Sequence, residues 1–163
     1  GLFAVTAGLG MQKKEQQFLA DHDDYSAIMF KALADRLVEA FAERLHQRVR
    51  TELWAYAPTE ALSPSDLIAE KYQGIRPAPG YPACPEHGVK SDLFRVLDCS
   101  EIGMGLTSSL AMTPAASVSG FYLAHPQASY FNVGKIGDDQ LQDWSKRSAQ
   151  DLELTRRSLA SVL

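Results

Sequence analysis

Cysteine, clustered positive charge and long apolar runs are all scarce in this sequence, and each shortage excludes a class of protein. The chain has 2 cysteines, Cys84 and Cys99, too few for a disulfide scaffold. Free thiols indicate a reducing compartment, which we expect to be the cytoplasm; a single bridge between the two is the alternative. The formal net charge is −4 and basic residues do not cluster, so we expect no nucleic-acid partner. No apolar run approaches the roughly 20 residues that cross a bilayer, so we expect no membrane association.

Motifs of several known catalytic and metal sites are also missing. The tripeptide Gly8-Leu9-Gly10 lacks the third glycine and the lysine of phosphate-binding loops. Cys84 and His87 have the spacing of half a zinc site, but no second close pair of ligands completes it. No serine has the context of a nucleophile elbow. We therefore expect neither a metal centre nor a catalytic residue in this chain.

The length of 163 residues and the hydrophobic content of 45% allow one globular core, so residues 1–163 are predicted to be a single domain. The first residues, 1–8, contain no initiator methionine, basic segment or cleavage site, and so do not resemble a signal peptide. They are typical of a β-strand that begins abruptly. We expect the chain to be cut from a larger polypeptide.

The strongest local pattern is helical and covers residues 24–54. Asp23 or Asp24 can cap its start, and Pro58 prevents continuation beyond Ala57. Such a helix of about 30 residues spans roughly 45 Å at 1.5 Å per residue, so we expect it to be the spine against which a sheet packs. Its predicted core-facing stripe recurs at every fourth position and consists of Met29, Leu33, Leu37, Phe41, Leu45, Val49 and Leu53.

Shorter elements are predicted on both sides of this helix. Apolar runs bounded by glycine or proline indicate strands, and Ser63 followed by Pro64 is typical of a helix start. The predicted strands cover residues 2–7, 110–112, 117–123 and 130–136, and the predicted short helices cover 11–22, 63–72, 91–97, 138–146 and 149–162. The last three strands would form an antiparallel meander. This order predicts an α+β fold, with an antiparallel β-sheet packed against the long helix and several short helices.

A proline-rich loop, residues 74–85, is the most distinctive candidate for a binding site. It holds 4 of the chain's 8 prolines, which exclude helix and sheet and lower the entropy of the loop before a ligand binds. Gly80 would let a ligand approach the backbone closely, and Tyr81 adds an aromatic face. The guanidinium of Arg76 suits a carboxylate, which it can hold with two parallel hydrogen bonds. The alternative is that the loop only wraps the surface and that Arg76 forms a structural salt bridge.

Two acids and a group of aromatic residues are further candidates. Glu39 lies off the apolar stripe of the long helix, and Glu70 lies just before the proline loop. Carboxylates at these positions would favour a cationic ligand, whereas most helix glutamates simply face water. Tyr122, Tyr130 and Phe131 fall in predicted strands, where aromatic side chains usually belong to the core but can also flank a ligand.

The string Arg76-Pro77-Ala78-Pro79-Gly80-Tyr81-Pro82-Ala83-Cys84-Pro85-Glu86-His87 resembles the signature of the activation domain of vitamin B12-dependent methionine synthase. Two further blocks match that family in the right order. The long-helix block includes residues 23–25, 31–37 and 39–43, and the sheet block includes 117–120 and 130–131. The resemblance therefore covers nearly the whole chain.

This resemblance implies a function within a methyltransferase. In that family the intact enzyme passes a methyl group from methyltetrahydrofolate to homocysteine through cobalamin, whose cobalt is occasionally oxidised to inactive cob(II)alamin. The activation domain binds S-adenosylmethionine and caps the cobalamin-binding domain. An electron from a flavodoxin-type reductase and the methyl group of S-adenosylmethionine then restore methylcobalamin. The isolated chain would position the methyl donor without being catalytic by itself.

The resemblance also implies roles for residues of the proline loop. Arg76 would hold the carboxylate of the ligand. The backbone of Ala78 and Gly80 would form hydrogen bonds with the adenosine or amino-acid groups. Tyr81 would face the corrin when the domains dock.

Outside the loop, Tyr130 and Phe131 would line the ligand, and Glu39 and Glu70 match acidic positions near its positive end. Phe131 stands where some relatives have a second tyrosine, so a hydroxyl contact is absent there. The family's domain also extends upstream of Gly1 and contributes an aspartate to ligand binding, which makes this chain the C-terminal part of such a domain.

Two other functions stay open at this point. A stand-alone S-adenosylmethionine-dependent methyltransferase is disfavoured because the chain has no strand, glycine-rich loop and helix of the doubly wound type. A docking module could cap the cobalamin domain without binding a ligand itself. The first strand, at 2–7, is also expected to lack a neighbour and to expose an edge that favours self-association.

Overall fold

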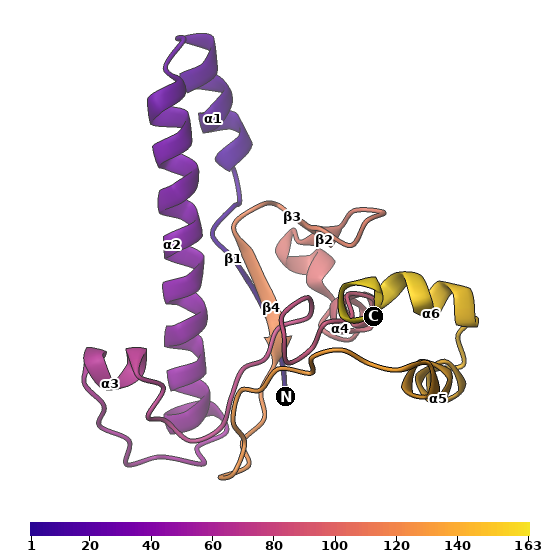
Figure 1. Cartoon of the computed structure of the whole chain (residues 1–163). Coiled ribbons are helices and arrows are strands. Elements are labelled where there is room, and N and C mark those ends of the chain that lie inside the picture. The colour runs from indigo at the N-terminus through magenta and orange to yellow at the C-terminus, as the bar shows by residue number, and fades with distance from the viewer.

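A computed structural model describes all 163 residues as an α+β fold built around one long helix (Figure 1). The strands are β1 (Leu2–Thr6), β2 (Gly105–Leu106), β3 (Met112–Thr113) and β4 (Ser117–Phe121). The α-helices are α1 (Met11–Ala20), α2 (Asp24–Arg48), α3 (Pro64–Ile68), α4 (Val89–Val96), α5 (Asp138–Ser148) and α6 (Leu152–Ser158). A π-helical turn η1 (Val49–Leu53) continues α2, and 3-10 turns η2 (Cys99–Ile102) and η3 (Ala160–Val162) follow α4 and α6. None of these helices has an apolar stretch long enough to cross a membrane.

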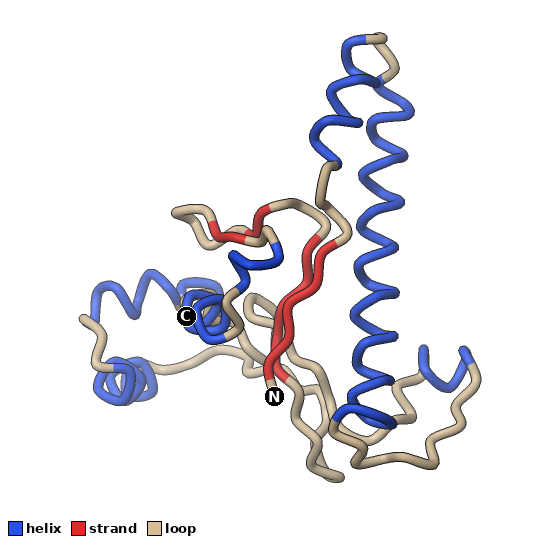
Figure 2. Tube along the Cα trace, turned by 180° about the vertical axis from the view of Figure 1, so that it is seen from behind, coloured by secondary structure: helices blue, strands red, loops and turns tan.

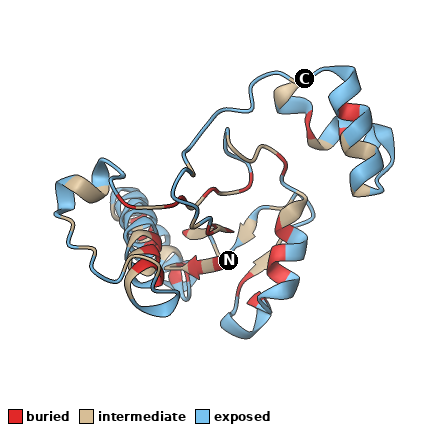
Figure 3. Ribbon diagram, turned by 90° about the horizontal axis from the view of Figure 1, so that it is seen from below, coloured by how far each residue is buried: buried red, intermediate tan, exposed pale blue.

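The central sheet consists of β1 and β4, which are far apart in the sequence. The two strands are antiparallel, and Phe3 lies opposite Gly120. Helix α2 packs on one face of this pair, and α4 packs on the other. In Figure 3 the buried residues of α2 and α4 lie on the sides that face the strands between them, and further buried residues lie in the loops and in the C-terminal helices. The strands β2 and β3 form a separate short hairpin beside α4.

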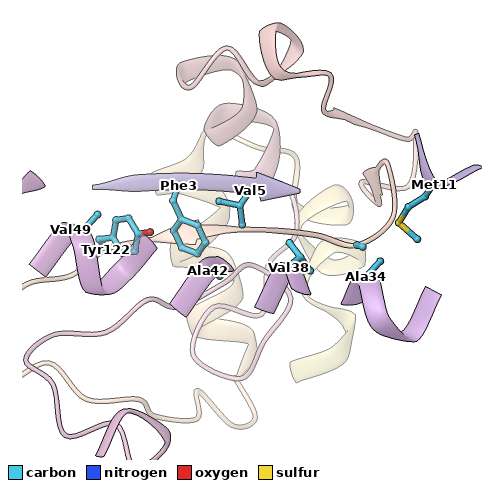
Figure 4. Packing of buried hydrophobic residues seen from close by; sticks show 9 residues of the cluster. Phe3, Val5, Met11, Ala34, Val38, Ala42, Val49 and Tyr122 are labelled. Carbon is cyan, nitrogen blue, oxygen red and sulfur yellow. The ribbon is translucent and has the colours of Figure 1, made fainter. Parts of the chain in front are cut away.

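The main core lies between β1 and α2. Phe3 and Val5 project from β1 toward α2 and pack against Val38 and Ala42 (Figure 4). Ala42 is only 1% exposed, and its small side chain allows the strand to lie close to the helix axis. A second cluster on the opposite face of the sheet packs Leu93 and neighbouring residues under Leu2 and Ala4.

The predicted spine helix is confirmed, but its predicted core face is wrong. Asp23 caps α2, and its side chain accepts a hydrogen bond from the Ser26 N–H at 2.9 Å. The buried row lies one residue further along than predicted: Ala34, Val38, Ala42, His46 and Arg50. The predicted stripe is largely uncovered, since Met29, Leu33, Leu37, Phe41 and Leu53 are 48–62% exposed. Where α2 crosses β1, residue size explains the difference, because the strand packs on the small side chains of Ala34, Val38 and Ala42 and leaves the bulkier row outside.

The predicted meander is also wrong. Residues 130–136 form no strand, and the chain runs as loop from the end of β4 to α5, as Figure 2 shows. Asn132 accepts a hydrogen bond from the Gly134 N–H, and Gly134 has a left-handed φ of 69°, so the backbone turns where a strand would have to continue. One bond, from the Val133 N–H to the Pro82 carbonyl at 3.0 Å, ties this loop to the proline loop.

The short helix α3 begins as predicted and ends earlier. Ser63 caps it in a reciprocal capping box with Asp66, and Pro64 occupies its first position. It ends at Ile68, four residues before the predicted end at Tyr72.

A buried ion pair secures the C-terminal end of α2. Arg50, in the π-helical turn, donates two hydrogen bonds to the Glu60 carboxylate at 2.6 and 2.8 Å. The two side chains are 0% and 6% exposed. Nearby, Arg48 and Glu52 form a pair that is 46% and 50% exposed. The same stretch of chain therefore contains a buried pair and an exposed pair of the same residue types.

We predict that Glu60→Ala lowers the free energy of unfolding by about 3–5 kcal/mol, because it leaves a buried guanidinium without its counter-charge. Glu52→Ala, the matched control, should cost less than about 1 kcal/mol, since its partner is exposed. Urea denaturation followed by circular dichroism measures both. Equal losses in the two variants would contradict a stabilising role for the buried pair.

Candidate functional site

An open cavity of about 620 Å³ lies where the proline loop passes the sheet. Its volume suits a ligand the size of a nucleoside or larger. Its lining comes from β1, β4, α2, the turn after α3, the proline loop and the segment after β4: Phe3, Glu39, Glu70, Arg76, Pro77, Ala78, Tyr81, Pro82, Ala83, Val118, Tyr130, Phe131 and Asn132. Seven of the eight binding residues predicted from the sequence therefore surround one cavity, and Gly80 is the exception.

Backbone hydrogen bonds hold the proline loop against the end of β4. Ile75 and Leu123 exchange bonds of 2.9 and 3.0 Å, and the Phe121 N–H donates to the Pro77 carbonyl at 2.9 Å. Gly120 permits this approach, because a Cβ at that position would lie 2.4 Å from the Pro77 oxygen. The loop thus continues the sheet at the edge of β4 and presents Ala78 to the cavity.

The fold itself requires a glycine at position 80. Its φ is +94°, and an added Cβ would lie 2.2 Å from the His87 ring, so the close approach it allows is that of His87. The Gly80 N–H donates to the Cys84 carbonyl at 2.7 Å, closing the turn. The Ala78 N–H and the Gly80 carbonyl have no hydrogen-bond partner in the chain. Two backbone groups of the loop therefore remain available.

Arg76 is already held by side chains of the chain itself. Its guanidinium forms a 2.8 Å ion pair with Glu43 and donates to the Tyr72 hydroxyl at 2.7 Å. Its Nη1 also lies 3.4 Å from His46 Nδ1. The Arg76 side chain remains 20% exposed and lines the cavity. Both sequence-based interpretations of Arg76 are thus compatible with its position: a structural salt bridge exists, and the guanidinium also reaches the cavity.

His46 is neutral in this structure. It is fully buried, and burial together with the charges of Arg50 and Arg76 lowers its pKa to about 3. Because Arg76 can only donate, the His46 Nδ1 accepts, which leaves the proton on Nε2, 3.4 Å from the Tyr56 hydroxyl. A neutral imidazole is what allows two guanidinium groups to lie beside it.

A column of aromatic rings connects His46 to the rest of the fold. Its ring stacks on Tyr122 at 5.0 Å, and Tyr122 stacks on Phe3 at 4.7 Å. On the other side His46 meets the edge of Tyr72 at 5.1 Å, and the Arg50 guanidinium lies 4.1 Å from the Tyr72 ring centre. Burial raises the pKa of both Tyr72 and Tyr122 well above the usual value, so both hydroxyls stay protonated. Tyr122 is therefore a core residue.

The two predicted acids lie at the cavity without partners of their own. Glu39 reaches it from α2, and Glu70 reaches it from the turn after α3, where its φ of 52° is left-handed. Neither carboxylate forms an ion pair with a residue of this chain. Two unpaired carboxylates at one cavity create a site that favours a positively charged group.

Aromatic side chains complete the lining from the irregular segment after β4. The Tyr130 hydroxyl accepts a hydrogen bond from the Arg76 backbone N–H at 3.0 Å, which fixes this ring beside the proline loop. Phe131 is 58% exposed and Tyr81 is 62% exposed. These exposed rings offer flat apolar surface to a ligand or a docking partner.

Several residues of the site on the sheet and on α2 were not predicted from the sequence. Phe3 and Val118 line the cavity from β1 and β4, and Asn132 follows the two predicted aromatics. Glu43 and His46 hold the Arg76 guanidinium from α2. The only sequence signal for this pair was their spacing of three residues, which places them on one side of the helix.

The fold and cavity together define an α+β domain with an open ligand-sized cavity beside a rigid proline loop. The chain belongs to the family described as "Vitamin B12 dependent methionine synthase, activation domain", whose model matches residues 1–149. It is also similar to a solved structure, the MetH reactivation domain bound to AdoHcy, with 53% sequence identity and a TM-score of 0.96. That match covers 99% of this chain and 50% of the other, so the chain spans about half the length of the solved relative. The expected family and fold class are confirmed.

We predict that acid destabilises this fold through His46. The pKa of His46 is lower in the folded state than the ordinary 6.5. Below pH 6.5 the unfolded chain therefore binds a proton at this residue, whereas the folded chain does not. The free energy of unfolding should fall by about 2 kcal/mol between pH 7 and pH 5 from this group alone. Urea denaturation at several pH values measures the slope.

The variant His46→Gln should be less stable at pH 7 and should lose most of this slope. The control His22→Asn changes an exposed histidine and should keep it. A slope that persists in His46→Gln would contradict the assignment.

Proposed function

We propose that this chain binds S-adenosylmethionine in the cavity beside the proline loop. The observation that carries the proposal is the convergence of Arg76, the free Ala78 N–H and the unpaired Glu39 and Glu70 on one cavity. S-adenosylmethionine has three groups that a site must bind. Its carboxylate needs a cation, its sulfonium needs nearby carboxylates, and its adenosine needs backbone hydrogen bonds or aromatic contacts. The AdoHcy in the solved relative is the same molecule without the transferable methyl group, which supports this choice of ligand.

Each predicted residue receives a role consistent with its position. Arg76 binds the ligand carboxylate with the part of its guanidinium that faces the cavity. Ala78 donates its free N–H. The Gly80 carbonyl, which lies outside the cavity lining but has no partner in the chain, would accept from the adenosine or amino group. Tyr130 and Phe131 provide apolar contact along the ligand.

Glu39 and Glu70 face the sulfonium, whose positive charge they favour. Bound in this way, S-adenosylmethionine supplies a methyl group on an electrophilic sulfonium. The chain's own contribution is orientation, because an exposed cavity next to an exposed Tyr81 leaves the ligand reachable from a second domain.

In the longer protein, we propose that this domain caps a cobalamin-binding domain of the same polypeptide and supports the reductive methylation of cob(II)alamin to methylcobalamin. The family's dependence on vitamin B12 supports the cobalamin-binding partner. A flavodoxin-type reductase is the proposed electron donor. Tyr81 is the residue that we assign to the docking face, because its ring is 62% exposed at the rim of the cavity. The chain acts as part of a methyltransferase in the cytoplasm and is not catalytic when isolated.

A docking module without a ligand is the second candidate, and one observation favours it. The Arg76 charge is already met by Glu43, so the arginine has a structural role without any ligand. The two functions differ in whether the cavity binds S-adenosylmethionine at all.

We predict that Arg76→Ala weakens S-adenosylmethionine binding by about 1.5–3 kcal/mol, or one to two decades in Kd, because a charge-assisted contact is lost. Isothermal titration calorimetry on the purified chain measures it. Glu43→Gln is the matched control: it removes the same ion pair but leaves the guanidinium free, so affinity should stay equal or rise. Equal loss in both variants would assign Arg76 a structural role, and absence of binding in the unaltered chain would favour the docking module.

We further predict that Glu39→Gln and Glu70→Gln weaken the binding of the charged sulfonium ligand more than the binding of the neutral thioether. Each should weaken S-adenosylmethionine binding by about 0.3–1 kcal/mol, because the acids are near the surface and solvent screens them. Binding of AdoHcy, which lacks the positive charge on sulfur, should change less. Competition titrations with the two ligands give the ratio. A similar loss for both ligands would remove the acids from the sulfonium site.

A further inference from the structure

The hydrogen-bond donors of the Arg76 guanidinium are divided between the fold and the cavity. Its Nη1 and Nη2 each carry two hydrogens, and its Nε carries one. Nη1 donates to the Tyr72 hydroxyl at 2.7 Å and lies 3.4 Å from His46 Nδ1, so both of its hydrogens have acceptors. Nη2 lies 2.8 Å from a Glu43 carboxylate oxygen, which can accept from only one side of that nitrogen. The Nε–H and at least one Nη2–H are therefore left without an acceptor in the chain.

These free donors form one edge of the planar guanidinium. The Nε–H and the neighbouring Nη2–H are parallel, and their spacing matches the two oxygens of a carboxylate. The Arg76 side chain lines the cavity and is 20% exposed. A ligand carboxylate can therefore bind side-on to this edge while the bonds from Nη1 stay intact.

Tyr72 holds the opposite side of the guanidinium from a fixed position. Its side chain is buried, and the residue is 8% exposed. The Tyr72 ring meets the His46 ring edge to face at 5.1 Å, and the Arg50 guanidinium lies 4.1 Å from its centre. Tyr72 is not among the residues that line the cavity, so its hydroxyl would affect a ligand through Arg76.

We propose that Tyr72 is a positioning residue for S-adenosylmethionine, because its hydroxyl holds Nη1 and so turns the Nε and Nη2 edge of Arg76 toward the ligand carboxylate. The inference rests on the proposed function, in which Arg76 binds that carboxylate. Glu43 Oε1 is buried without a hydrogen-bond partner, so it would accept from a guanidinium that is free to turn. Loss of the Tyr72 hydroxyl therefore lets Glu43 compete with the ligand. Tyr72 thus determines selectivity for ligands that carry an amino-acid carboxylate.

The test compares two probes, AdoHcy and 5′-methylthioadenosine. Both have an adenosine and a neutral thioether, and only AdoHcy has the amino-acid carboxylate. Tyr72→Phe should weaken AdoHcy binding about three- to tenfold, because Arg76 stays in place but loses its orientation. Binding of 5′-methylthioadenosine should stay within about twofold, since it makes no contact with the guanidinium. Isothermal titration calorimetry measures both affinities, and a general loosening of the fold would weaken both probes alike.

Tyr122→Phe is the matched control. Tyr122 is buried and stacks on the same His46 ring at 5.0 Å, but its hydroxyl has no hydrogen-bond partner in the chain. Both probes should bind this variant as they bind the unaltered chain. In an Arg76→Ala background, Tyr72→Phe should cause no further loss of AdoHcy affinity, because Tyr72 acts through Arg76. Phenylalanine keeps the ring contacts at either position, and thermal unfolding checks that each variant is folded.

The outcomes separate this inference from the proposed function. If Tyr72→Phe weakens both probes equally or neither, the positioning role is overturned and ligand binding stands. An equal selective loss in Tyr122→Phe would assign the effect to any buried hydroxyl of the column and would also overturn the role. A full additional loss in the Arg76→Ala background would show that Tyr72 does not act through Arg76. If the unaltered chain binds neither probe, the proposed function fails and this inference fails with it.

Discussion

A column of buried rings and charges is the feature on which the rest of this structure depends. Phe3 stacks on Tyr122, Tyr122 on His46, and His46 meets Tyr72, whose ring the Arg50 guanidinium covers. The column joins the first strand, the end of the last strand, the long helix and the start of the proline loop. These four parts are far apart in sequence, and the two-stranded sheet alone is too small to hold them. The constraint on the column is electrostatic: His46 must stay neutral between two guanidinium groups.

The same column positions the candidate site. Tyr72 and His46 hold the Arg76 guanidinium on one side, while Glu43 neutralises it. The arginine is therefore placed before a ligand arrives, and the backbone of the proline loop is rigid because its prolines and its bonds to the sheet restrict it. A ligand carboxylate must share this guanidinium with Glu43. No group of the chain competes for the Ala78 N–H. The site therefore has one free backbone donor and one guanidinium that is already paired within the fold.

The two edges of the small sheet have different environments. The β4 edge is extended by the proline loop, and the ligand-sized cavity forms there. The β1 edge is free and borders an apolar groove. One edge therefore places polar groups at a cavity, and the other has unpaired backbone groups beside apolar side chains. The chain thus presents two chemically distinct surfaces on opposite edges of a single pair of strands.

The sequence by itself determined several local elements and seven of the residues that line the cavity. The Asp23 cap, Ser63 with Pro64, and the prolines after Arg76 act through their own backbone and neighbouring residues, so the start of α2, the start of α3 and the extended loop were all predictable. Seven of the eight predicted binding residues meet at one cavity. Five of these seven come from only two short segments, the proline loop and the aromatic pair of Tyr130 and Phe131.

The tertiary structure alone decided which face of α2 is buried, which strands pair, and what Arg76 touches. The row with Leu37 and Phe41 was the more apolar, but β1 packed on Val38 and Ala42, because close packing depends on the volumes of both surfaces. Residues 130–136 had strand-like composition but turn at Gly134 and pair with no strand. The pairing of β1 with β4, and of Arg76 with Glu43 and His46, joins residues distant in sequence. No local propensity encodes such contacts, since they arise only when the whole chain has packed.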